Sequence, residues 1–203
     1  MTTRVPRFTP AERWVHRATA LLVGVLIATG AILYDGSLAV LVGRRALVAG
    51  VHVTAGLLLP VPALLGLLSR AFRADLGRLN RFAPDDWAWL QRRDRRVGGL
   101  AVGKFNAGQK LAAAFVAGAG LTLLGTGLVM LGPTVWDVPV GWRQGATTVH
   151  DGLAFALVVV LVGHLWEAYR HPEARAALRT GSIDAEYAAR EHPAWTPAPP
   201  AGG

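Results

Sequence analysis

Four histidines of the chain stand where they could bind iron as axial ligands. His16 and His52 lie in the first and second apolar segments, and His150 and His164 lie at the two ends of the fourth. In a helix the last two are separated by about 21 Å and share one face to within about 40°. Neutral imidazole is a common axial ligand of haem iron, and an ionisable residue inside an apolar span usually faces a site rather than lipid. The histidines therefore predict two stacked haems b.

Four apolar segments position these histidines. They cover about 14–34, 46–68, 111–131 and 149–166, and each is close to the ~20 residues that cross a bilayer core. The 203 residues are 52% hydrophobic and 17% charged, and almost all of the charges lie outside these segments. This pattern predicts an all-α membrane protein, in which a single domain over 1–203 forms a four-transmembrane-helix bundle that encloses the two haems.

No cleavable signal peptide is expected, because the first segment is long and lacks a cleavage pattern. Since the chain has no cysteine, a cofactor must be held by nitrogen or oxygen ligands.

The basic residues predict the orientation in the membrane. All but three of the 21 Lys and Arg residues lie in the N-terminal segment, in the loop at about 69–110 or in the C-terminal tail. The positive-inside rule therefore places both termini and this loop in the cytoplasm. Topology and anionic lipid headgroups account for the net charge of +8, and no nucleic-acid motif accompanies it.

This topology groups the four histidines into two pairs. His52 and His150 fall near the outer face, and His16 and His164 fall near the inner face. Each pair joins two different helices at matching depth, as a bis-histidine haem requires. A single histidine in a span is about as often a hydrogen-bonded structural residue, and a haem-free transporter or metal-binding membrane protein could use the same four.

Local signals mark the helix boundaries. Thr9-Pro10-Ala11-Glu12 has the form of a capping box that starts the first helix. Pro60 and Pro62 should kink the second span. The stretch from Pro84 to Leu90 predicts a short helix at the membrane surface, because it begins with acids and carries tryptophans.

The C-terminal tail follows the last span. Its last part, about 196–203, is rich in Pro and Gly and is predicted to be flexible. His171 and His192 lie in this polar region and are expected to be ordinary surface residues.

One stretch of sequence carries a family resemblance. Gly103-Lys104-Phe105-Asn106-Ala107-Gly108-Gln109-Lys110 resembles the sequence that opens the third span in the gamma subunit of membrane-bound formate dehydrogenase. Further matches follow in the same order as in that family, at Val51-His52, Val149-His150, Gly163-His164 and Glu191-His192-Pro193-Ala194-Trp195. The resemblance covers nearly the whole chain.

The resemblance implies a function in respiration, in the inner membrane of a bacterial cell. In that family a four-helix cytochrome b takes electrons from an iron-sulfur beta subunit outside the membrane and reduces menaquinone or ubiquinone near the cytoplasmic side. Formate is oxidised on an alpha subunit that contains molybdenum or tungsten. The residues that match the ligands of the two haems b are His16, His52, His150 and His164.

The quinone pocket of that family matches Asn106 and Gln109, and Gly108 would let the backbone approach the ring. Asn106 and Gln109 could instead only cap the third helix. The family commonly has tryptophan directly after the first ligand, where this chain has Arg17, which could pair with a haem propionate or reach the lipid headgroups. A cytochrome b subunit of a hydrogenase or a sulfur-compound reductase would keep the haems and change the electron donor.

Overall fold

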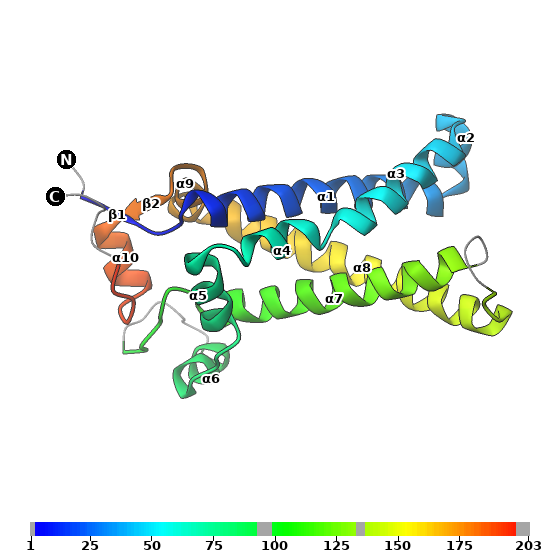
Figure 1. The fold of residues 1–203 in the computed structure, drawn as a ribbon. Coiled ribbons are helices and arrows are strands. Elements are labelled where there is room, and N and C mark those ends of the chain that lie inside the picture. Colours follow the sequence, from blue (N-terminus) through cyan, green and yellow to red (C-terminus); the bar gives the residue numbers. More distant parts are fainter. Residues whose placement is uncertain (1–2, 93–98, 133–136, 198–203) are drawn as a thin grey trace. The chain divides into compact units, whose positions relative to one another are not determined.

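Helices make up most of the computed structural model, which describes residues 3–92, 99–132 and 137–197. Figure 1 shows the helices α1 (Pro10–Tyr34), α2 (Gly36–Val42), α3 (Arg45–Leu58), α4 (Val61–Gly66), α5 (Arg70–Leu79), α6 (Pro84–Gln91), α7 (Ala107–Leu131), α8 (Val140–Arg170), α9 (Pro172–Thr180) and α10 (Ala185–Glu191). Two short strands, β1 (Arg4–Pro6) and β2 (Ser182–Asp184), complete the described elements. The segment predicted to be flexible is about 196–203, and its residues 198–203 lie outside the described residues.

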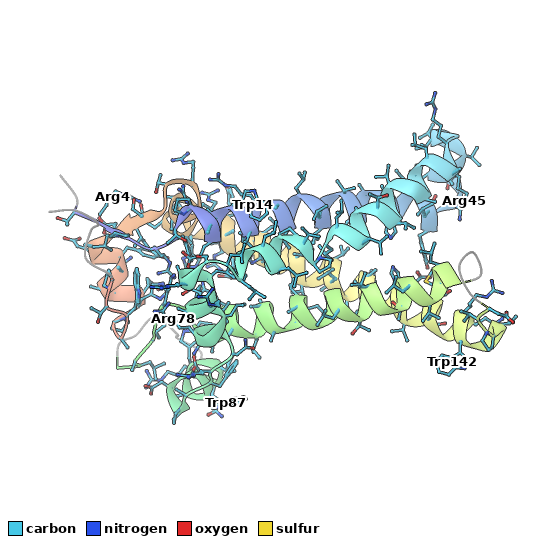
Figure 2. All side chains as sticks on the ribbon, in the orientation of Figure 1. Arg4, Trp14, Arg45, Arg78, Trp87 and Trp142 are labelled. Atoms are coloured by element: carbon cyan, nitrogen blue, oxygen red, sulfur yellow. The ribbon has the colours of Figure 1, made fainter. Side chains whose placement is uncertain are left out.

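Four stretches of helix are long and apolar enough to cross a membrane. They are α1, the stretch Arg45–Gly66 that holds α3 and α4, α7, and α8. Large apolar side chains such as Leu21, Phe155 and Val162 are exposed on them, which is the surface expected of helices that face lipid. Trp142, near the start of α8, is 72% exposed and points away from the helix (Figure 2), as an aromatic ring at a membrane interface does. The prediction of four transmembrane helices is confirmed.

The described chain falls into two compact units. The bundle unit comprises Val15–Leu65 and Val116–Val162. The terminal unit comprises Met1–Trp14, Gly66–Phe115 and Gly163–Gly203. The helices α1, α7 and α8 each begin in one unit and end in the other.

In the bundle unit, small residues let the helices approach each other. A Cβ atom built on Gly56 of α3 would lie 3.8 Å from Leu26 Cδ2 of α1, and one built on Gly120 of α7 would lie 3.8 Å from Leu59 Cδ2. Contacts of this kind are the usual basis of helix packing in membranes. The second span is interrupted between Leu58 and Val61, at the predicted proline position, since proline removes a backbone donor.

The terminal unit joins the two ends of the chain. Strands β1 and β2 pair antiparallel, with Val5 opposite Ile183. Ile183 packs with Ala177 and Ala188 in a small buried core. The apolar side chains around that core are Val5, Phe8, Tyr187 and Trp195. The sequence had predicted only helices, because three-residue strands carry too little alternation to be recognised.

The turn before β2 depends on Gly181. Its φ is +90°, and a Cβ atom there would lie 2.7 Å from the carbonyl oxygen of Phe8. The amides of Arg7 and Phe8 donate hydrogen bonds to the Gly181 carbonyl, at 2.8 and 3.0 Å. Only glycine allows both this backbone conformation and this close approach of the two chain segments.

Two predicted helix starts in the terminal unit are confirmed. Thr9 donates its backbone amide to Glu12 Oε2 at 2.6 Å, and the Glu12 amide donates to Thr9 Oγ1 at 3.4 Å. These bonds form the capping box of α1. Helix α6 begins at Pro84, and the amide of Ala83 donates to Asp86 Oδ2 at 2.8 Å.

Candidate functional site

The bundle unit brings His52 of α3 and His150 of α8 together. The centres of their imidazole rings are 6.3 Å apart, and the ring planes meet at 60°. These two histidines form the pair expected near the outer face. Their separation in sequence is large, so the contact depends entirely on the packing of the helices.

This distance matches the geometry of two imidazoles on one metal ion. A metal to imidazole bond is about 2.0 Å long, and the ring centre lies about 1.1 Å beyond the nitrogen, so two rings on opposite sides of a metal have centres about 6 Å apart. Rings that share one ligand axis can adopt any angle between their planes. The pair therefore fits the axial positions of one haem iron.

Each histidine of this pair also contacts a threonine hydroxyl. Thr29 Oγ1 of α1 lies 2.9 Å from His52 Nδ1, and Thr126 Oγ1 of α7 lies 2.9 Å from His150 Nδ1. With Nδ1 engaged in this way, Nε2 is the nitrogen left to bind a metal. Neither threonine was predicted from the sequence. The signal that could have found them is a Thr-Gly dipeptide that precedes each histidine by a similar distance in sequence.

The glycines of these dipeptides lie next to the imidazole rings. A Cβ atom built on Gly30 would be 3.5 Å from His52 Cε1, and one built on Gly127 would be 3.5 Å from His150 Cε1. Any side chain larger than a methyl group would have to displace the ring. The two halves of the site thus repeat the same arrangement of threonine, glycine and histidine.

The two histidines expected at the inner face belong to different units. His16 belongs to the bundle unit and His164 to the terminal unit, and both side chains are exposed. Their pairing on one iron remains a prediction.

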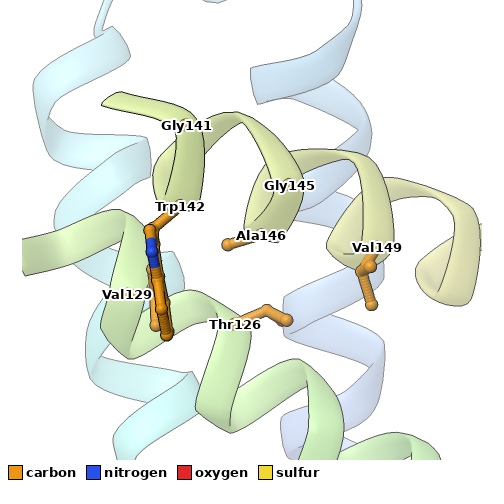
Figure 3. A pocket seen from close by; sticks show the side chains of 7 residues that line it. All are labelled: Thr126, Val129, Gly141, Trp142, Gly145, Ala146 and Val149. Carbon is orange, nitrogen blue, oxygen red and sulfur yellow. The ribbon is translucent and has the colours of Figure 1, made fainter. Parts of the chain in front are cut away.

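A groove lies on the bundle unit next to Thr126. It has a volume of about 460 Å³ and is formed by α7 and α8 (Figure 3). Its lining residues are Thr126, Val129, Gly141, Trp142, Gly145, Ala146 and Val149. Among these, Thr126 and the Trp142 indole carry the side-chain polar groups, so the groove suits an apolar chain rather than a charged ligand.

In the terminal unit, the stretch Gly103–Lys110 contains a buried lysine, Lys104, which contacts residues from other segments. Lys104 is 7% exposed, and its ammonium group contacts Glu12 Oε1 at 3.0 Å and also Asp75 Oδ2. It lies 4.8 Å from the centre of the Phe8 ring, within the range of a cation–π interaction. A buried ammonium group needs such partners, since an unpaired one would be very costly.

The carboxyl group of Asp75 holds a proton more tightly than an ordinary aspartate. Burial and its hydrogen bond with Glu12 raise the pKa of Asp75 to about 6, against the opposing effect of Lys104 and of Arg78. A proton on Asp75 lets it donate to Glu12, so the two acids can lie close together beside one lysine.

The two amide residues of this stretch cap α7 reciprocally. The Gln109 backbone amide donates to Asn106 Oδ1 at 2.9 Å, and the Asn106 backbone amide donates to Gln109 Oε1 at 3.0 Å. Asn106 and Gln109 therefore have the capping role that was one of their two expected roles. Capping uses the side-chain oxygens, which leaves the amide nitrogens as hydrogen-bond donors for a ligand.

Gly108 and Lys110 also have structural partners. A Cβ atom on Gly108 would lie 3.0 Å from Cη2 of Trp89, so this indole ring covers the position. Lys110 Nζ pairs with Asp86 Oδ2 at 2.6 Å. Gly108 thus allows close packing of α7 against Trp89 of α6, and its predicted contact with a quinone remains a prediction.

The expectation that His192 is a surface residue is wrong. It is 5% exposed, and its Nδ1 donates to the Gly103 carbonyl at 2.8 Å. Burial and the nearby charge of Arg7 lower the pKa of His192 to about 4. His192 therefore connects the C-terminal tail to the stretch that begins at Gly103, a contact that local composition could not reveal.

Comparison with known proteins identifies the family. No curated protein matches the chain. A family model described as prokaryotic cytochrome b561 matches residues 7–180, which is most of the chain. This family consists of helical-bundle membrane cytochromes b that bind b-type haem and act in electron transfer. With its four membrane-spanning helices and its facing histidines, the chain belongs to the prokaryotic cytochrome b561 family.

Proposed function

We propose that the chain is the membrane-anchoring di-haem cytochrome b subunit of a formate dehydrogenase. In this role it passes electrons from an extracytoplasmic iron-sulfur subunit across the membrane to quinone. The observation that carries the proposal is the approach of His52 and His150, whose ring centres lie 6.3 Å apart. The stretch Gly103–Lys110, with its resemblance to formate dehydrogenase gamma subunits, supports the choice of complex.

The four histidines hold the two haems in pairs. His52 and His150 hold the outer one, and His16 and His164 hold the inner one. When bound, haem b supplies one-electron transfer at its iron. The protein contributes the axial nitrogens, an apolar surrounding and two sites at different depths of the membrane.

The position of the quinone site determines how the electrons contribute to energy conservation. An electron that moves across the membrane changes its free energy by about 2.3 kcal/mol per 100 mV of membrane potential. Quinone reduced at the inner face takes its protons from the cytoplasm, while formate oxidation releases protons outside. The complex would thereby build a proton-motive force.

The quinone binds where α7 begins. Its carbonyl oxygen accepts hydrogen bonds from the amide nitrogens of Asn106 and Gln109, whose oxygens cap the helix. Both residues lie on the side of the chain that the basic loop assigns to the cytoplasm, where water can supply protons.

The family match supports a second candidate equally well. A cytochrome b subunit of a hydrogenase or of a sulfur-compound reductase would have the same haem sites, because the family match concerns the cytochrome b and does not establish its electron donor. The genes for neighbouring subunits distinguish these candidates. A molybdenum- or tungsten-dependent formate dehydrogenase subunit encoded beside this chain is the expected result.

Spectra of the purified protein test the haem sites. The reduced-minus-oxidised difference spectrum should contain b-type haem bands, and the haem content should be two per chain. His52→Ala or His150→Ala should remove one haem, and His16→Ala or His164→Ala should remove the other, because each iron loses half of its axial ligation. His171→Ala is the matched control and should keep both.

Two results would contradict the proposal. A colourless protein after expression with adequate haem supply would favour a haem-free transporter. Two low-spin haems in His150→Ala would show that the pairing is wrong.

A further inference from the structure

The two threonines beside the outer histidine pair have a defined hydrogen-bond direction. Thr29 Oγ1 lies 2.7 Å from the carbonyl oxygen of Val25, one turn earlier in α1. A hydroxyl has a single proton, and two oxygens at this distance need that proton between them. Thr29 therefore donates to Val25 and can only accept from His52 Nδ1.

The second half of the site repeats this arrangement. Thr126 Oγ1 lies 2.8 Å from the carbonyl oxygen of Thr122, again one turn earlier in its helix. It must therefore accept a hydrogen bond from His150 Nδ1, at 2.9 Å. Helices α1 and α7, which are distant in sequence, thus each place a threonine hydroxyl beside one histidine. Both hydroxyls have the same hydrogen-bond direction.

We propose that Thr29 and Thr126 are positioning residues that fix the tautomer and the ring orientation of His52 and His150, and thereby set the reduction potential of the haem that these histidines hold. The proposal rests on the proposed haem site. A proton on Nδ1 leaves the lone pair on Nε2, which is the form of imidazole that binds iron. The backbone of each helix holds the hydroxyl in place through the Val25 and Thr122 carbonyls.

The hydrogen bond also acts on the iron through the ring. An Nδ1–H that donates to an oxygen makes the imidazole a stronger electron donor, because partial negative charge builds up on the ring. A stronger donor stabilises ferric relative to ferrous iron and lowers the potential. Removal of either hydroxyl should therefore raise the potential of the outer haem.

The glycine next to each threonine supports a positioning role. Gly30 and Gly127 let one edge of each ring approach α1 and α7, with Cε1 3.5 Å and Nδ1 3.9 Å from the position of a Cβ atom. Each ring thus lies next to a glycine at Cε1 and contacts a threonine hydroxyl at Nδ1. These contacts restrict rotation about the axis that the iron would share with both rings.

Redox titration of threonine variants tests the proposal. Thr29→Val and Thr126→Val keep the volume of the side chain and remove the hydroxyl. We expect each to favour the ferrous form of the outer haem by about three- to tenfold, which corresponds to about 30 to 60 mV for a one-electron couple. The double variant should give about the sum of the two shifts, since each threonine acts on a different ligand.

Two further substitutions serve as controls. Thr29→Ser and Thr126→Ser retain the hydroxyl and should restore the wild-type potential. Thr122 lies one turn from Thr126 on the same helix, and its hydroxyl donates to the Gly118 carbonyl at 2.9 Å. Thr122→Val removes this hydroxyl and keeps the backbone carbonyl that accepts from Thr126. It should leave the potential of the outer haem unchanged.

The outcomes separate this proposal from the haem assignment itself. If the wild-type protein binds no haem, the proposed function fails. If haem is bound, but the outer haem has the same reduction potential in Thr29→Val and Thr126→Val as in Thr122→Val, the positioning role is wrong. If the valine variants lose the outer haem, the serine variants decide: retention of haem at the wild-type potential supports the proposal, and loss of haem there overturns it.

Discussion

Asn106 illustrates how one residue can have both a structural and a functional role. Its side-chain oxygen accepts the Gln109 amide and so starts α7. Its amide nitrogen is the group that we assign to the quinone. An alanine substitution removes both groups and cannot separate the two roles, whereas aspartate keeps the capping oxygen and lacks the amide nitrogen.

Asn106→Asp should therefore leave both haems bound and reducible, while it slows their reoxidation by added quinone. The loss of one hydrogen bond of about 1 kcal/mol corresponds to a slowing of about fivefold. Stopped-flow spectroscopy of the reduced haem bands measures this rate. Asn80→Asp, at the end of α5, makes the same change of charge and should have the wild-type rate. Equal rates in the two variants would place the quinone site elsewhere.

At the scale of the element, the position of residues 192–195 in the C-terminal tail depends on the buried His192. His192 donates to the Gly103 carbonyl, and the Ala194 amide donates to the Val102 carbonyl at 3.0 Å. The guanidinium of Arg7 lies 5.0 Å from the centre of the Trp195 ring. These contacts hold the tail against the segment that leads into α7.

We expect the docking of this tail to weaken between pH 6.5 and pH 4. The pKa of docked His192 is about 4, against 6.5 for an ordinary histidine, so an undocked tail binds a proton in this range and a docked tail does not. Above pH 6.5 the imidazole is neutral in both states, and docking should not depend on its titration. The effect of Asp75 has the opposite sign, because its raised pKa makes the folded state the one that binds a proton.

Hydrogen exchange of residues 192–195, compared at pH 7 and pH 5 after correction for the intrinsic exchange rate, measures this effect. Protection should be lower at pH 5. His192→Asn keeps a donor close to the position of Nδ1 and does not titrate, so its protection should not depend on pH. A pH dependence that persists in His192→Asn would assign the effect to another group.

At the scale of the whole molecule, the distribution of basic residues predicts the orientation in the membrane. Reporter fusions after Gly36 or Pro139 should report an extracytoplasmic location. Fusions near Gln91 or at the C-terminus should report a cytoplasmic location, because the basic segments remain inside. The opposite pattern would reverse the direction of electron transfer that we propose.

The sequence by itself determined the four spans, two helix starts and the chemistry available to them. Hydropathy and length predicted the four spans, because each span must be apolar over about 20 residues. The capping box at Thr9 and the start of α6 at Pro84 were predicted for a similar reason, since the hydrogen bonds that form them join residues only three positions apart. The expected depths of the histidines follow from their positions along these spans.

The tertiary structure decided which of these groups meet. The distance between His52 and His150, the threonine hydroxyls behind them and the buried position of His192 all depend on contacts between segments far apart in the chain. The rotation and register of one helix against another are set by side-chain packing. A pattern within one helix contains no information about its neighbour, so only the packed helices establish that each histidine contacts a threonine hydroxyl.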